Sequence, residues 1–155
     1  MRGLEMISLN IQTNLISIMM LLTLYFSLSN QTNKREMINR IFIAVLFFTF
    51  AILILDSFQI AFDGNTTAFG GVISQVSTFG YFLLHPFIPL LWLIYLDYHI
   101  FKNTKRIQKI IYITLPLVIG HTILVILSTM GNYLYYIDSA NNYFRGRLFW
   151  ITPLF

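Results

Sequence analysis

Polar side chains inside long apolar segments are the strongest candidates for chemistry in this chain: His85, His121, Asp56 and Gln59. An ionisable group at membrane depth costs at least about 2.5 kcal/mol on insertion scales, so each is a candidate functional group. His85 and His121 each lie near mid-segment, and they face one another if their segments are antiparallel. Asp56 and Gln59 are three residues apart and share a helix face. We expect the four to line a ligand pocket.

Each of these positions also has a structural interpretation. Asp56 can make an interhelical hydrogen bond, or it can lie protonated near the interface. A neutral histidine can satisfy itself against a backbone carbonyl that Pro86 or Pro89 leaves without its helical donor. A haem held between His85 and His121 is a further alternative. We expect no other cofactor, and no metal site.

A second polar group marks the predicted inner membrane interface. Asp97 is followed closely by Lys102 and Arg106. A carboxylate paired with basic loop residues is typical of interface anchoring. We therefore expect these three residues to anchor the chain and to have no part in a ligand site.

A third polar group lies in a tyrosine-rich stretch from 132 to 147, which we predict to be an outer loop. Its candidate site residues are Asp138, Asn141, Tyr143 and Arg145. The tyrosines fit the aromatic belt at a membrane surface. No catalytic motif accompanies these residues, because the sequence holds no HExxH, no GxSxG and no phosphate-binding loop. We therefore expect no catalytic residues in this segment.

Composition points to an integral membrane protein. Of the 155 residues, 57% are hydrophobic and 10% are charged, whereas a soluble domain carries about 25% charged residues. The net charge of +4 falls in short clusters between apolar runs, which does not fit a nucleic-acid-binding face. The chain has no cysteine, and this excludes thiolate metal sites and cysteine nucleophiles. The expected partner is the lipid bilayer.

Hydropathy predicts an all-α, polytopic helix bundle over residues 1–155. Four spans are expected at about 7–28, 41–62, 72–101 and 110–130, and the start of a fifth at 148. The polar beginning of the first span must reach the headgroups or face other helices. Pro86 and Pro89 should kink the third. The last eight residues would rise about 12 Å as a helix, too little to span a bilayer, so we expect a fragment of a larger protein.

Basic residues predict the orientation, because short cytoplasmic loops retain positive charge. The loops after the first and third spans hold seven of the ten basic residues: Lys34, Arg35, Arg40, Lys102, Lys105, Arg106 and Lys109. Three others, Arg2, Arg145 and Arg147, fall on the opposite side. The N-terminus is therefore expected outside, with alternating spans.

Two stretches carry a family resemblance. Residues 91–102 (LWLIYLDYHIFK) and 136–146 (YIDSANNYFRG) resemble the N-terminal multi-helix sensor region of bacterial membrane-bound diguanylate cyclases of the GGDEF type. The resemblance covers nearly the whole chain, and related membrane inputs also precede histidine kinases. It implies a signal-input module in a bacterial plasma membrane, regulating a cytoplasmic cyclase beyond residue 155.

The resemblance also implies a homodimer formed through the full-length protein and an unidentified small-molecule or peptide signal. A stand-alone small membrane protein is the alternative function, either a transporter subunit or a haem-binding carrier. A reading frame that continues past residue 155 into a soluble domain separates the two interpretations.

The predicted orientation is testable by cysteine labelling. Single cysteines at Asn65 and Asn142 should react with an impermeant maleimide in intact cells, because both positions lie on the side with few basic residues. Cysteines at Asn33 and Asn103 should react after the cells are permeabilised. Reversed labelling would contradict an outside N-terminus.

Overall fold

The structure is a computed structural model that describes residues 2–29 and 36–154. In chain order its elements are α1 (Arg2–Ser29), α2 (Met37–Phe62), α3 (Ala68–Leu84), α4 (Phe87–Phe101), α5 (Thr104–Gly131), β1 (Tyr135–Ile137), β2 (Tyr143–Arg145) and the 3-10 helix η1 (Phe149–Leu154). Lys34 and Arg35, on which the predicted orientation partly depends, lie outside the described residues.

Four helical segments are long and apolar enough to cross a membrane: Leu9–Ser27, α2, Ala68–Phe101 and α5. They match the four predicted spans and confirm an all-α helical bundle. Their apolar surface is largely turned outward, since at most 17% of the residues in each span's most apolar window are buried. Helices with apolar outer surfaces, joined by polar loops, are typical of a multi-pass membrane protein.

The third span is broken where the sequence predicts a kink. It consists of α3 and α4, which meet at His85 and Pro86. Pro86 has no backbone N–H, so the carbonyl four residues earlier, that of Phe82, loses its helical donor. Pro89 lies in the first turn of α4, where a missing N–H is tolerated. The chain therefore bends at one point and remains helical on either side.

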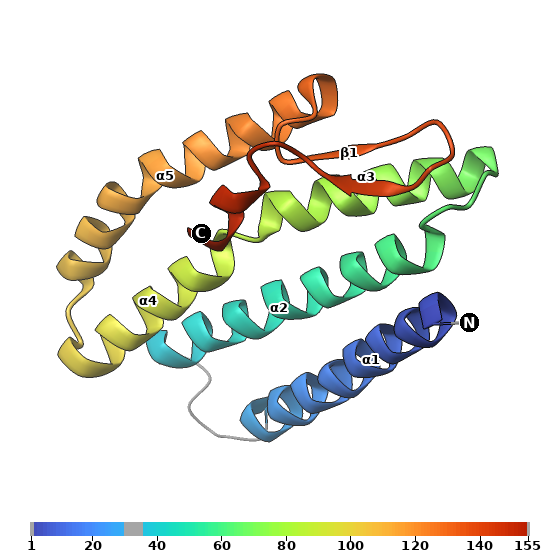
Figure 1. The fold of residues 1–155 in the computed structure, drawn as a ribbon. Coiled ribbons are helices and arrows are strands. Elements are labelled where there is room, and N and C mark those ends of the chain that lie inside the picture. Colours follow the sequence, from blue (N-terminus) through green and yellow to red (C-terminus); the bar gives the residue numbers. More distant parts are fainter. Residues whose placement is uncertain (1, 30–35, 155) are drawn as a thin grey trace.

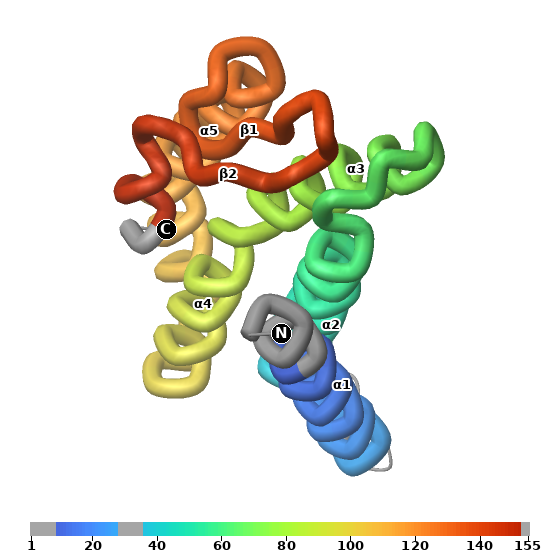
Figure 2. The backbone as a smooth tube through the Cα atoms, turned by 45° about the vertical axis from the view of Figure 1, so that its right-hand side comes forward, coloured from blue at the N-terminus to red at the C-terminus, as the bar shows by residue number. Residues whose placement is uncertain are grey.

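α2 lies at the centre of the arrangement (Figure 1). It packs against α1 on one side and against α3 and α4 on the other, and α5 packs against α3 and α4. α1 runs along the edge of the bundle (Figure 2). The start of α2 and the end of α4 lie side by side, because Met37 and Tyr98 line the same cavity. We call the end of the bundle formed by the start of α2 and the end of α4 the basic end. The opposite end, where β1 and β2 lie, is the hairpin end.

The hairpin end carries structure that the sequence analysis did not predict. β1 and β2 pair antiparallel, with Tyr135 opposite Arg145, where we expected only a polar loop. The hairpin lies over α3 and α5 (Figure 2). The buried cluster at this end comprises Phe82, Val125, Leu134 and Tyr135. Tyr135 stacks on Phe82 with ring centroids 4.9 Å apart.

The hairpin tip is fixed to the loop between α2 and α3. The Asn141 side-chain amide donates to the carbonyls of Phe62 and Asn65, both at 3.0 Å. The Gly64 N–H donates in return to the Asn141 carbonyl at 2.8 Å. Asn141 itself has a φ of 64°, a left-handed conformation that asparagine tolerates better than most residues. Tip and loop therefore form one unit.

Residues 149–154, where the sequence predicts the beginning of a fifth span, form the 3-10 helix η1. Phe149 packs edge-on against Phe82, with ring centroids 6.3 Å apart. Arg145 places its guanidinium carbon 4.6 Å from the centre of the Phe149 ring. η1 therefore folds back against α3, and the expected fifth span stays a prediction.

Substituting Asn141 tests the attachment of the hairpin tip. Asn141→Ala should destabilise the protein by about 2–3 kcal/mol, because it removes two hydrogen bonds and replaces asparagine with a residue that adopts positive φ less readily. Asn141→Gly removes the same hydrogen bonds but permits the conformation, so it should cost less. Thermal unfolding in detergent measures both, and equal losses for the two variants would contradict a role for backbone strain.

Candidate functional site

His121 is bonded to the carbonyl that Pro86 leaves free. Its Nε2 lies 2.9 Å from the carbonyl oxygen of Phe82, and its side chain is 1% exposed. Since a carbonyl can only accept, Nε2 carries the proton and donates. The interaction joins α5 to the break in the third span, one of the structural interpretations that the sequence leaves open.

His85 lies close to His121, as the sequence analysis expects. It caps the end of α3 and is half-buried, with the centre of its ring 5.8 Å from that of Tyr81. The two imidazoles are near enough to interact electrostatically. The Nδ1 atom of His85 is buried and has no hydrogen-bond partner. The structure therefore brings the two histidines together where α3 meets α5.

Asp56 contacts a different helix. Its Oδ2 accepts a hydrogen bond of 2.7 Å from the side-chain amide of Asn14 in α1. The same amide lies 3.2 Å from the hydroxyl of Ser57. Asn14 is buried, so the polar beginning of the first span faces α2 at this position. Gln59 lies on the next turn of α2, half-buried.

Tyr81 connects these two places, although the sequence analysis did not single it out. It lies near Asp56 of α2, and its ring contacts that of His85. It also packs against the buried cluster at the hairpin end, as Tyr143 does. The available signal was its spacing, because Tyr81 precedes His85 by four residues and must share its helix face.

A cavity with a mixed polar and apolar lining lies nearer the hairpin than the four predicted pocket residues. Its volume is about 370 Å³, and its lining comes from α3, α5 and the hairpin: Gln75, Val76, Phe79, Ser128, Thr129, Asn132, Tyr135, Tyr136 and Ile137. Amide and hydroxyl groups thus lie beside aromatic rings. Such a lining suits a small molecule with both polar and apolar surface.

Burial of two hairpin tyrosines controls their ionisation. Desolvation raises the pKa of Tyr135 to about 12. Desolvation also raises the pKa of Tyr143 to about 12, although the charge of Arg145 opposes this shift. Both phenols therefore stay neutral at physiological pH, and both keep a hydroxyl donor at the hairpin.

The remaining outer-loop candidates build the hairpin. Asp138 Oδ1 accepts from the backbone N–H of Asn142 at 2.8 Å and from that of Ala140 at 2.9 Å. The Asn142 bonds lower the pKa of Asp138, because they favour its charged form. Asp138 thus forms the turn, and Asn141 fixes the turn to the α2–α3 loop.

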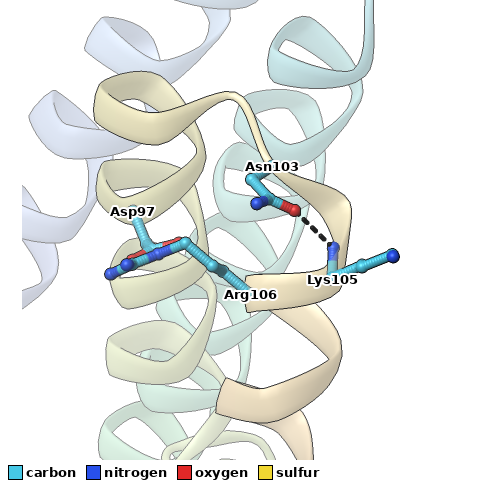
Figure 3. A network of polar contacts seen from close by, with 4 residues as sticks. All are labelled: Asp97, Asn103, Lys105 and Arg106. Atoms are coloured by element: carbon cyan, nitrogen blue, oxygen red, sulfur yellow. Dashed lines mark hydrogen bonds and ion pairs between the residues drawn. The ribbon is translucent and has the colours of Figure 1, made fainter.

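The predicted anchor at the basic end is an ion pair. Arg106 Nη2 lies 2.8 Å from Oδ1 of Asp97, and Arg106 Nε lies 3.1 Å from the same oxygen (Figure 3). The guanidinium carbon also lies 3.7 Å from the centre of the Phe101 ring. Lys102 ends α4 in a left-handed conformation, and Asn103 caps α5 by accepting from the Lys105 N–H at 3.0 Å. These contacts fix the α4–α5 turn.

The geometry does not favour haem between the two histidines. Nε2 of His121 is already bonded to the Phe82 carbonyl, and iron ligation there would leave that carbonyl unpaired in an apolar environment. Within the described part of the chain, no group of three or more His, Asp or Glu side chains lies close enough to hold a metal ion.

A double-mutant cycle tests the Asn14–Asp56 contact. Asn14→Leu, Asp56→Leu and the double variant should show a coupling of about 1 kcal/mol, because the amide and the carboxyl lose a partner together. Thr13→Leu is the matched control, since Thr13 is exposed and bonds within its own helix. Unfolding in mixed micelles measures the coupling. Additive single effects would contradict the contact.

Comparisons with protein-family models, with curated proteins and with solved structures give no match for this chain. The features that bear on its function are those of its own geometry. That geometry comprises a cavity under a fixed hairpin and a histidine pair at a broken helix.

Proposed function

We propose that this chain is the membrane-embedded signal-input region of a bacterial signalling protein, and that its signal is a small molecule bound beneath the hairpin. The cavity between α3, α5 and the hairpin carries the proposal. A volume of about 370 Å³ is within the range of small-molecule sites, which favours a small molecule over a folded peptide.

The elements around the cavity belong to different parts of the fold. Gln75 comes from α3, Thr129 from α5 and Tyr136 from the hairpin. A ligand that contacts all three stabilises one relative arrangement of them. Its differential affinity for that arrangement shifts the conformational equilibrium. Such a shift is the elementary event of signal input.

α5 is the element that connects the cavity to the basic end. It begins beside the ion pair of Asp97 and Arg106 and ends at Gly131, next to the cavity. A change in its packing at one end therefore alters the α4–α5 turn at the other. With the N-terminus outside, that turn faces the cytoplasm of a bacterial plasma membrane.

The output that we propose follows from the family resemblance. A diguanylate cyclase domain beyond residue 155 would be regulated through a homodimer of the full-length protein. In this scheme the present segment binds and transmits, and nucleotide chemistry belongs to the output. The lipid bilayer that surrounds this segment is its proposed partner.

Cavity variants of the full-length protein test the proposal. Thr129→Phe adds ring volume to the cavity and Gln75→Leu removes an amide from it. Each should change cyclic di-GMP production per molecule in isolated membranes by about fivefold, the lower range of allosteric coupling. Val72→Phe is the control, because Val72 is 60% exposed on the apolar surface of α3 and does not line the cavity. Cavity variants that behave like this control would contradict the proposal.

A further inference from the structure

One face of α3 carries polar groups at helical spacing. Ser74, Thr78, Tyr81 and His85 follow one another at intervals of four, three and four residues, so they lie in a row. We call these four residues the α3 stripe. It runs from the hairpin end to the break at Pro86, which lies within the membrane-spanning part of the chain.

The hydroxyls of this stripe differ from most others in the bundle. Donation to the carbonyl four residues earlier is how a serine or threonine in an apolar helix normally satisfies its hydroxyl. That bond is made by Thr13, Ser17, Thr23, Thr49, Ser57, Thr114 and Ser128. Ser74 and Thr78 do not make it, and their hydroxyl oxygens are buried without a hydrogen-bond partner. These two hydroxyls therefore lack the bond that the other seven make.

Ser74 and Thr78 are both 0% exposed. A buried hydroxyl without a partner destabilises a folded protein, and native structures contain few of them. Two such hydroxyls one helical turn apart therefore call for an occupant that supplies the missing bonds.

Unpaired polar atoms continue the row in both directions. At the hairpin end, Oδ1 of Asn141 is buried without a partner. It lies 3.9 Å from the position that a Cβ on Gly71 would take, and Gly71 precedes Ser74 by three residues. At the other end, Nδ1 of His85 is also buried without a partner. The row thus extends from the hairpin tip to the histidine.

We propose that the α3 stripe is a water-binding track that leads from the hairpin end to His85. Side chains four residues apart on a helix are about 5–6 Å apart, and two hydrogen bonds of about 2.8 Å span that distance through one water molecule. Water both donates and accepts, as hydroxyls, amides and imidazoles require.

The track has a consequence for the histidine pair. Water that reaches His85 from the hairpin end gives its imidazole polar surroundings at a depth where lipid would otherwise exclude them. This inference is independent of the small-molecule site, because the residues of the α3 stripe are not among those that line the cavity.

Cysteine accessibility tests the track, and the chain has no cysteine of its own. Ser74→Cys and Thr78→Cys should react with 2-aminoethyl methanethiosulfonate added to the full chain in proteoliposomes. Reaction needs the thiolate, which forms in water and not in lipid. Val72→Cys is the control, because Val72 is 60% exposed on the same helix and lies off both the stripe and the cavity lining. We expect stripe positions to react about tenfold faster than the control. Rates equal to or below the control would overturn the proposal.

A stability measurement covers the case in which the cysteine variants fail to accumulate. Ser74→Ala with Thr78→Val removes both hydroxyls and keeps nearly the same shape. If the hydroxyls hold water, the thermal midpoint in detergent should fall, because bound water loses its partners. If they are dry and unpaired, removing them should leave the midpoint unchanged or raise it, and either result would overturn the proposal.

Discussion

The hydrogen bond between His121 and the Phe82 carbonyl is the interaction on which the arrangement of α3 and α5 depends. Pro86 frees that carbonyl inside an apolar segment, where an unpaired backbone group costs several kcal/mol. His121 supplies the donor at 2.9 Å. The bond thereby fixes which face of α5 meets α3. Val125 and Ser128 follow on that same face, four and seven residues later.

The position of the hairpin follows from that face of α5. Val125 joins Phe82 in the buried cluster, and the Ser128 hydroxyl accepts a 2.8 Å hydrogen bond from the Leu134 N–H. The contact with α5 therefore fixes where the chain enters β1. Asn141 then attaches the far end of the hairpin to the loop after α2. The cavity is a consequence of these contacts, because its lining belongs to the elements that they hold together.

α1 shows how little lipid itself contributes to helix placement. Apolar side chains gain nothing by leaving lipid for another apolar helix, so packing and polar contacts decide orientation. The Asn14–Asp56 bond of 2.7 Å fixes the rotation of α1 about its own axis. Leu15, Met19 and Phe26 remain exposed, as expected for a helix at the edge of a bundle that faces lipid.

The sequence by itself determined the helical spans and the break in the third of them. Both depend on local properties: length and apolarity for a span, and a missing N–H for the break at Pro86. The ion pair of Asp97 and Arg106 could also be predicted, because a tight turn brings residues nine apart together. Proximity of His85 and His121 could be expected from depth alone, since neighbouring spans are antiparallel.

Apart from the pair of Asp97 and Arg106, only the tertiary structure decided which polar groups are partners. The sequence placed Asp56 and Gln59 with the histidines, but rotation of α2 directs Asp56 towards Asn14. The attachment of Asn141 to Phe62, 79 residues earlier, carries no local signal, and the spacing of Tyr81 from His85 indicates only that they share a helix face. Helix rotation and loop docking depend on contacts between segments far apart in the chain, and neither hydropathy nor spacing records them.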